Sequence, residues 1–320
     1  MSTHDSARLP SYATLSHEDA LHFAAVTLAG TYDLALVEKD WSSRQPYLEN
    51  NGYMLRTRYR PRWSPSWLGT NRDPTFCEDS IMLEKYNVID AIRLCDGSCV
   101  SIKTTRKTSQ EINIASFVSS PELMKDPRNH CVQLLEVLPD PLQADSALMV
   151  MPYLRPFDDP EFGAIGEVVE FVKQILEGIC FLHQHRIAHR DCAAANIMMD
   201  GHPLFPYGHH PVRRGHSPDS VHELVPLSRI DHPVRYYLID FGISSRFPPG
   251  ASSFVVGRQG RDKDLPELSS DVPYNAFKVD IFTLGNLYGK DFAEVSPLIA
   301  CNQLGLTHNR NITGLNSCSL

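Results

Sequence analysis

The sequence has no stretch of about 18 consecutive apolar residues, the length that a helix needs to cross a bilayer. It also lacks a basic start followed by an apolar run, because the chain opens with MSTHDSARLP. Positive charge is in deficit: 30 Lys and Arg stand against 38 Asp and Glu, for a formal net charge of −8. We therefore expect neither secretion nor membrane spanning, and no general attraction to nucleic acid or anionic lipid.

Cysteine is present without a pattern. The eight cysteines form no CxxC pair and no dense framework, so reduced thiols in an intracellular protein, cytoplasmic or nuclear, are expected. Apolar residues make up 42% of the 320 residues, which is enough for the core of one large domain or two modest ones.

The first 75 residues read as an extension that begins with a helix. In SHEDALHFAAVTLAG, Ser16 is placed to cap the helix and Asp19 lies in its first turn. Residues 52–70, GYMLRTRYRPRWSPSWLGT, then interleave arginines with tyrosines and tryptophans. Such a segment can stack on single-stranded nucleic acid. The interpretation we favour is packing against its own domain, with arginine stems lying along aromatic faces.

The rest of the chain predicts strands first and helices second. Residues 86–103 read as two strands joined at Asp96-Gly97, and a helix is predicted from Ser109 onwards. HCVQLLEVLPD and ALMVMPYL read as two more strands. Residues 167–184 repeat apolar side chains at helical spacing, and YYLIDFG reads as an apolar strand after a long loop. This order predicts an α+β chain in two lobes.

Three oxygen-bearing side chains follow buried elements and are expected to meet in one cleft. Asp191 and Asn196 lie on a short loop after the predicted helix, and Asp240 ends an apolar strand. Magnesium takes such oxygen ligands, with waters and phosphate oxygens completing its coordination. Lys103, at the end of the strand VSIK, is placed to contact phosphate if another group orients it.

These residues form a pattern that resembles a known family. HRD at residues 189–191 with Asn196 resembles the catalytic loop of protein kinases, and DFG at residues 240–242 resembles their metal-binding triplet. VSIK upstream, and LPE and DIFTLG downstream, complete the resemblance. It covers roughly residues 80–289 and implies a bilobal protein-kinase-like fold, with a small β-rich N-lobe and a helical C-lobe. The phrasing DPRNHCV, RPFDDP and HRDC is similar to divergent kinase-like proteins of mushroom-forming fungi.

The resemblance implies a role for each site residue. Asp191 would accept the proton of a substrate hydroxyl, and Asn196 would help to hold Mg²⁺. Asp240 would ligate Mg²⁺ that bridges the phosphates of ATP, and Lys103 would contact the α- and β-phosphates.

The same resemblance implies a partner for the lysine and a place for the adenine. Glu111 fits as the acid of the helix after the lysine strand, although it lies only eight residues after the lysine, and Glu122 is a rival. Pro152 and Leu154 occupy the hinge, where Pro152 keeps a carbonyl and Leu154 an N–H for the base.

Two departures from the family concern catalysis. No glycine lies between Gly69 and Gly97, so EKYNVIDAIRL stands where the family usually carries a GxGxxG phosphate loop. Serine/threonine kinases carry a lysine two residues after the catalytic aspartate, and tyrosine kinases commonly an arginine four residues after it. Here these positions are Ala193 and Ala195, and the missing positive charge is expected to slow the transfer of a phosphoryl group.

A third departure is an insertion between Asn196 and Asp240, which are separated by 43 residues. Its histidines can bind zinc when they cluster, but the proline-broken sequence favours an exposed surface loop. The histidines of the insertion are His202, His209, His210, His216, His222 and His232.

The chain ends soon after the resemblance stops. The residues after Gly289 are too few for the further helices of the family, and the only arginine after Glu267 is Arg310. We therefore expect a shortened or mis-spliced C-lobe with Glu267 left to solvent or to a substitute partner. The expected organisation is an extension at 1–75, an N-lobe at 76–151, a C-lobe at 152–289 with an insertion at about 200–235, and an atypical tail at 290–320.

The function expected is transfer of the ATP γ-phosphoryl group to a hydroxyl of an unknown protein substrate. Serine or threonine is favoured over tyrosine, although the catalytic loop itself does not distinguish them. The alternative is a pseudokinase, an ATP-binding or scaffold module without productive turnover, which the missing glycines and the two alanines favour.

Overall fold

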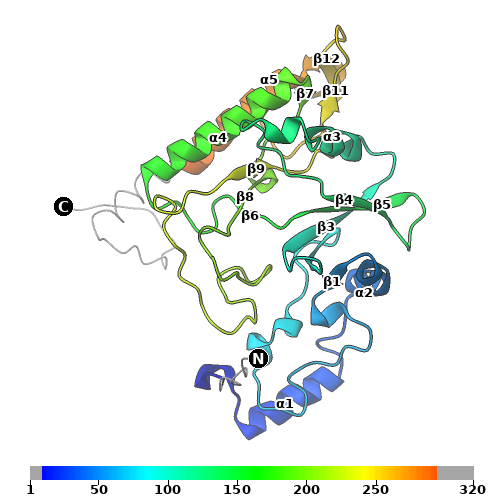
Figure 1. The fold of residues 1–320 in the computed structure, drawn as a ribbon, viewed down its shortest axis with the longest axis vertical. Coiled ribbons are helices and arrows are strands. Elements are labelled where there is room, and N and C mark those ends of the chain that lie inside the picture. Colours follow the sequence, from blue (N-terminus) through cyan, green and yellow to red (C-terminus); the bar gives the residue numbers. More distant parts are fainter. Residues whose placement is uncertain (1–8, 294–320) are drawn as a thin grey trace, which may run out of the picture.

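The computed structural model describes residues 9–293, which form two lobes (Figure 1). The helices are α1 (His17–Leu28), α2 (Leu36–Asn50), α3 (Gln110–Val118), α4 (Ile165–Gln184) and α5 (Ala276–Ala293). The strands are β1 (Tyr53–Leu55), β2 (Val88–Arg93), β3 (Cys99–Arg106), β4 (Glu136–Pro139), β5 (Ser146–Pro152), β6 (Arg155–Pro156), β7 (Ile187–Ala188), β8 (Ile197–Met199), β9 (Tyr236–Leu238), β10 (Ser245–Arg246), β11 (Phe254–Gly257) and β12 (Ser269–Asn275).

The smaller lobe is built on one antiparallel sheet with the strand order β1-β2-β3-β5-β4. The turn between β2 and β3 contains Gly97 at φ +73°, a left-handed conformation that glycine adopts without strain. Side chains alternate between the faces of a strand. Val100 and Ile102 of β3 are therefore buried in the core that the sheet shares with α2, while Lys103 reaches toward the larger lobe.

A buried ion pair fixes α2 to the segment after β1. Glu38 accepts hydrogen bonds from Arg58 Nε at 2.8 Å and Nη2 at 3.0 Å, and from the Tyr59 hydroxyl at 3.0 Å. The Arg58 guanidinium also lies over the ring of Trp63, 4.9 Å from its centroid. The arginine and aromatic side chains of this segment thus pack against their own domain, which is the interpretation that the sequence favoured.

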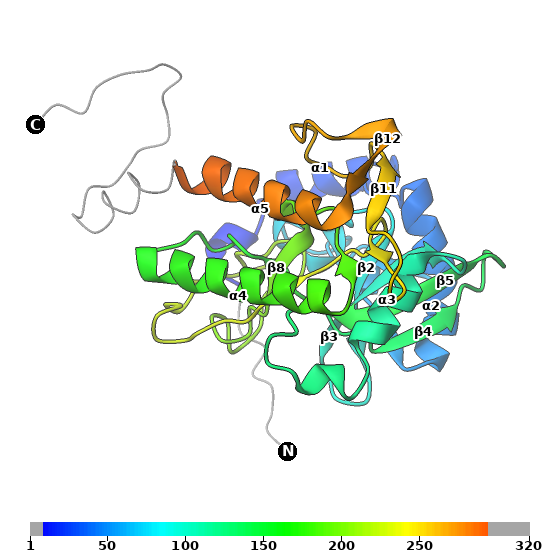
Figure 2. The same cartoon turned by 90° about the horizontal axis from the view of Figure 1, so that it is seen from above.

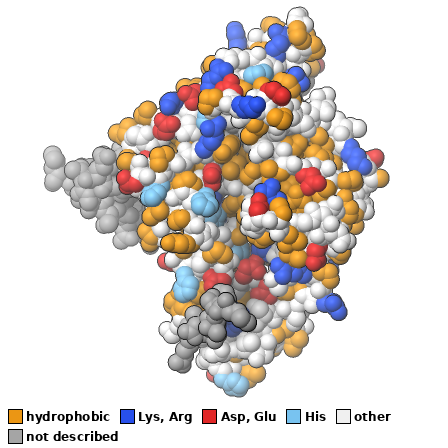
Figure 3. Space-filling model, in the orientation of Figure 1, with side chains coloured by type: hydrophobic (Ala, Val, Ile, Leu, Met, Phe, Trp, Pro, Cys, Tyr) orange, Lys and Arg blue, Asp and Glu red, His pale blue; other side chains and the backbone are white. Residues whose placement is uncertain are grey.

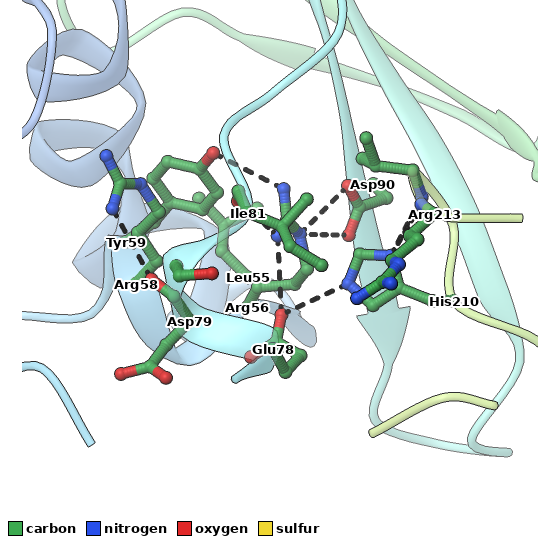
Figure 4. Close-up of polar contacts among 12 residues, drawn as sticks. Leu55, Arg56, Arg58, Tyr59, Glu78, Asp79, Ile81, Asp90, His210 and Arg213 are labelled. Atoms are coloured by element: carbon green, nitrogen blue, oxygen red, sulfur yellow. Dashed lines mark hydrogen bonds and ion pairs between the residues drawn. The ribbon is translucent and has the colours of Figure 1, made fainter. Parts of the chain in front are cut away.

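A long connection, residues 56–87, joins β1 to β2 and contains Gly69 as its only glycine. The sequence YNVIDAIRL, which we expected to stand where the phosphate loop would be, contains strand β2 itself. Figure 4 shows how the connection is tied to that strand: Arg56 lies between Asp90 of β2 and Glu78 of the connection. Its Nη1 also donates to the Ile81 carbonyl at 2.7 Å.

The larger lobe is held together by α4 and α5, which lie side by side (Figure 2). Phe171 of α4 contacts Tyr288 and Phe292 of α5, with ring centroids 6.3 and 5.7 Å apart. The apolar face of α4 buries Ile175 and Ile179 against β8 and β9. No helix within residues 9–293 is long and apolar enough to cross a membrane.

The insertion between β8 and β9 contains no helix or strand but is only partly exposed. It runs from the larger lobe toward the N-terminal extension (Figure 1). Arg214 donates to Glu84 Oε2 at 2.7 Å and to Asp159 Oδ2 at 2.8 Å, and the Tyr153 hydroxyl donates to the Pro211 carbonyl at 2.6 Å. The insertion therefore contacts both lobes. The expectation of a simple exposed loop is wrong, because several apolar residues of the insertion are buried in the core.

Some histidines of the insertion are exposed, and Figure 3 shows histidine side chains at the surface on that side of the molecule. His210 is instead fully buried. Its Nδ1 accepts hydrogen bonds from the backbone N–H groups of Val212 and Arg213, so Nε2 carries the proton and faces Glu78 at 3.7 Å. Within the described residues, no three or more His, Cys, Asp or Glu side chains form a group that could hold a metal.

Local signals in the sequence predicted many of these elements. Ser16 caps α1 by accepting from the Asp19 N–H at 3.1 Å, and Ser109 caps α3 in the same way through the Glu111 N–H at 3.1 Å. The strands at HCVQLLEVLPD and ALMVMPYL are confirmed as β4 and β5, and the helix at residues 167–184 as α4. Helix α2 and strand β1 were not predicted.

We predict that Glu38→Ala lowers the free energy of unfolding by about 3–5 kcal/mol, because it leaves the buried Arg58 guanidinium without its carboxylate. Chemical denaturation measures the change. Asp40→Ala is the matched control, since this acid lies on the exposed face of the same helix, and we expect it to change stability by less than about 0.5 kcal/mol. Equal effects of the two substitutions would contradict the role given to the ion pair.

His209 gives a second prediction. Burial of its ring against Tyr153 and Phe205 lowers the pKa of His209 from 6.5 to about 4. Between these pH values the unfolded state binds a proton that the folded state does not, so this part of the stability is lost as the pH falls below 6.5. Because His209 is partly exposed and solvent screens its charge, we expect this contribution to the free energy of unfolding to be about 1–2 kcal/mol.

The test compares His209→Gln with the wild type by denaturation at neutral pH and near pH 5. The variant is expected to lose less stability on acidification than the wild type. His202→Gln, in an exposed residue of the same insertion, is the control and should leave the loss unchanged. An unchanged pH dependence in His209→Gln would show that His209 titrates normally.

Candidate active site

Lys103 joins the two lobes. Its Nζ lies 2.5 Å from Glu111 Oε1 of α3 and 2.9 Å from Asp240 Oδ1 after β9. Burial alone would lower the pKa of Lys103, but the two carboxylates outweigh burial and raise it. Burial would likewise raise the pKa of Asp240, and the ammonium group outweighs that effect and lowers it. Lys103 and Asp240 are therefore both ionised at neutral pH.

The structure selects between the two acids that the sequence left open as partners of the lysine. Glu111 lies in the first turn of α3, is almost fully buried, and also accepts a hydrogen bond from the Thr105 hydroxyl at 3.0 Å. Glu122 lies beyond the end of α3 and is exposed. The short separation between Lys103 and Glu111 is accommodated because α3 begins directly after β3.

A buried carboxylate of α5 holds the loop that carries Asp191. Asp280 accepts hydrogen bonds from the backbone N–H of His189 at 2.9 Å and of Arg190 at 2.6 Å, and contacts His183 Nε2 at 2.8 Å. The side chain is fully buried, so these contacts are its compensation for lost water. The downstream motif DIFTLG thus anchors the loop through its first residue, Asp280.

His189 ties the same loop to the end of β9. Its Nε2 lies 3.0 Å from the Ile239 carbonyl and must donate there, while Nδ1 lies 3.3 Å from the Asp191 N–H and accepts. The neighbouring Arg190 and Asp240 both adopt left-handed backbone angles, with φ values of +68° and +65°. Non-glycine residues in this region are strained, and such strain concentrates at functional sites.

Asp191 and Asn196 are oriented by one another. Asn196 Nδ2 donates to Asp191 Oδ2 at 2.7 Å and to the Asp191 carbonyl at 3.0 Å. Because both partners are acceptors, the amide nitrogen must face them and Oδ1 points elsewhere. Asp240 Oδ1 accepts from Lys103 and from the Gly242 N–H, while Oδ2 accepts no hydrogen bond from the described residues.

Two oxygens of the site, Asn196 Oδ1 and Asp240 Oδ2, are ligands of the kind that a divalent cation binds. Asn196 Oδ1 and Asp240 Oδ2 are both hard oxygen ligands, and a cation that keeps its waters and binds phosphate oxygens needs only one or two protein ligands. The site residues therefore fit the metal that the resemblance implies.

The hinge residues line a cavity of about 950 Å³. Pro152 ends β5 opposite Val100, and Leu154 lies between β5 and β6. The cavity is also lined by the connection between β1 and β2 and by the insertion. None of Lys103, Asp191 or Asp240 lines it, so it opens beside the catalytic residues rather than over them.

The segment after Asp240 brings a residue to Asp191 that the sequence did not single out. The backbone N–H of Arg261 donates to Asp191 Oδ1 at 2.7 Å, and Arg261 Nε lies 3.7 Å from Asp191 Oδ2. No local pattern predicts this contact, because the two residues are 70 positions apart.

Ser245 and Glu267 are two other residues of the segment after Asp240. Arg190 Nη1 donates to the Ser245 hydroxyl at 3.1 Å, while its buried Nη2 has no hydrogen-bond partner among the described residues. Glu267 is exposed and makes no ion pair within residues 9–293. Arg310 and most of the tail at 290–320 lie outside the described residues.

Comparison with known proteins agrees with this geometry. Residues 85–310 match the family model for the protein kinase domain. The chain belongs to the protein kinase family. The two-lobed α+β fold that the resemblance implied is thereby confirmed. Kinase chemistry in general uses ATP, a divalent metal and a protein substrate.

One curated kinase relative is informative about similarity but not about substrate. A probable CTD kinase subunit alpha homolog of Encephalitozoon cuniculi (strain GB-M1) is 30% identical over 98 residues, which are 29% of this chain and 26% of the relative. The matched stretch thus spans about a quarter of that kinase subunit. The kinase family match also extends past Gly289, where we expected the resemblance to stop.

Proposed function

We propose that the chain is an active protein kinase that transfers the γ-phosphoryl group of Mg²⁺-bound ATP to a protein hydroxyl, with serine or threonine as the favoured acceptor. The observation that supports this best is Lys103, whose Nζ is held 2.5 Å from Glu111 and 2.9 Å from Asp240. Mg²⁺, when bound, would neutralise phosphate charge. Asn196 Oδ1 and Asp240 Oδ2 would hold it.

Each residue of the site has a defined task in this proposal. Lys103 orients the α- and β-phosphates as a fixed positive charge, which Glu111 keeps in place. Asp191 accepts the proton of the acceptor hydroxyl and is oriented for this by the Asn196 amide. Asp280 keeps Asp191 in position through the backbone of the two preceding residues.

A pseudokinase is the second candidate, and the connection between β1 and β2 is the observation that favours it. Residues 56–87 contain one glycine and no GxGxxG sequence, so the backbone lacks the loop that usually approaches the phosphates. Binding of Mg²⁺ and ATP without phosphate transfer would identify this alternative. The two candidates therefore separate on turnover and not on binding.

We predict that Asp240→Ala weakens the affinity for ATP in the presence of Mg²⁺ by about tenfold or more, because it removes a charged ligand contact. Thermal shift titration with ATP, with Mg²⁺ and with a chelator, measures the effect. Asp231→Ala, at an exposed aspartate near β9, is the control and should bind like the wild type. A folded wild-type protein without metal-dependent stabilisation would refute every ATP-based function.

We predict that Asp191→Asn leaves ATP affinity within about twofold but lowers kcat by about 10²–10⁴, because an amide cannot accept the hydroxyl proton. Transfer of labelled phosphate to the protein itself or to a generic protein substrate provides the rate. If Asp191→Asn had the same kcat as the wild type, Asp191 would be excluded as the base.

A further inference from the structure

The catalytic loop carries no positive charge between Asp191 and Asn196. Ala193 and Ala195 stand where other kinases carry a lysine or an arginine, and their methyl groups offer no charge to the transferring phosphoryl group. Lys103 lies on the other side, paired with Glu111 and Asp240. A phosphoryl group that passes from ATP to a hydroxyl carries negative charge on its equatorial oxygens, so a cation on the acceptor side would lower the barrier.

Arg261 occupies that side. Its guanidinium Nε is 3.7 Å from Asp191 Oδ2, and its backbone N–H donates to Asp191 Oδ1 at 2.7 Å. A hollow of about 390 Å³ beside the loop is lined by Ala193, Ala194 and Arg261. The side chain is 55% exposed, so it remains free to turn toward a phosphoryl group while its backbone stays fixed.

Gly260 explains why the backbone comes so close. Its φ is +106°, and a Cβ at this position would lie 3.2 Å from the Arg190 carbonyl and 3.6 Å from Asp191 Oδ1. Residues with a side chain are strained in that conformation and would also push against the catalytic loop. The glycine therefore allows the Arg261 N–H to reach Asp191.

We propose that Arg261 supplies the positive charge at the transferring phosphoryl group that Ala193 and Ala195 do not, and that Gly260 positions it. This inference rests on the proposed kinase activity. In the step concerned, the acceptor hydroxyl oxygen bonds to the γ-phosphorus of ATP as the bond from that phosphorus to the β–γ bridging oxygen breaks. ADP leaves with that oxygen and its electron pair, and the hydroxyl proton passes to the Asp191 carboxylate. Arg261 forms no covalent bond.

Steady-state phosphate transfer by the full chain tests the inference. Arg261→Ala is expected to lower kcat by about 10- to 100-fold, in the range seen when one preorganised donor is removed, while the dissociation constant for ATP changes less than about twofold. Arg261→Lys should keep much of the rate because it keeps the charge. Arg258→Ala, in an exposed arginine of the same segment, is the matched control and should transfer phosphate like the wild type.

A rescue experiment separates charge from structure. When Ala193→Lys is added to the Arg261→Ala variant, the catalytic loop itself places a cation in the same hollow. This second substitution should raise the rate of phosphate transfer by at least about tenfold. A merely structural role of Arg261 would not respond to this change. Thermal melting of each variant checks that it is folded.

The outcomes are distinct. If Arg261→Ala transferred phosphate as fast as the wild type, the inference would be overturned and the proposed function would stay intact. A loss in Arg261→Ala that Ala193→Lys fails to restore, in folded protein, would also overturn it. A wild-type protein that binds ATP without any transfer would overturn both the proposed function and the inference.

Discussion

The contact between Lys103, Glu111 and Asp240 is the constraint on which the site depends. It joins β3, α3 and the end of β9, so it fixes the smaller lobe relative to Asp240 of the larger one. Three partly buried charges would be costly one by one, and only their mutual neutralisation makes the arrangement stable. The same contacts raise the pKa of Lys103 and lower the pKa of Asp240, so both of these groups stay ionised. The positions of the strand, the helix and the DFG segment are therefore linked through a single ammonium group.

Buried carboxylates serve as anchors elsewhere in the molecule in the same manner. Asp280 replaces its lost water with two backbone N–H groups and a histidine, and thereby sets the path of the catalytic loop. Glu38 binds Arg58 and Tyr59, and thereby attaches α2 to the segment after β1. A buried carboxylate without such partners would be expelled or protonated. Each anchor thus specifies one arrangement of the chain around it.

The sequence predicted those parts of the fold that depend on short-range chemistry. The cap at Ser16, the start of a helix near Ser109 and the turn at Gly97 each follow from residues within one turn of one another. The order of the HRD and DFG motifs likewise led to the prediction that Asp191 and Asp240 share one site. Local patterns did not predict α2, because its apolar stripe is weak and Pro46 interrupts it. They also missed the contact between Arg261 and Asp191, which depends on the tertiary path of the chain.

At each place where the chain departs from the usual kinase pattern, another segment of the chain lies close to the site. The connection between β1 and β2 lines the cavity beside the hinge with Arg56 and its acidic partners instead of a glycine loop, and His210 of the insertion faces Glu78 of this connection (Figure 4). Arg213 of the insertion donates to the Thr75 carbonyl of the same connection. On the opposite side of the chemistry, the alanines of the catalytic loop leave a hollow that Arg261 lines. The absence of a motif residue therefore does not by itself show that activity is lost. A residue that the fold brings to the same place can supply the missing charge or packing.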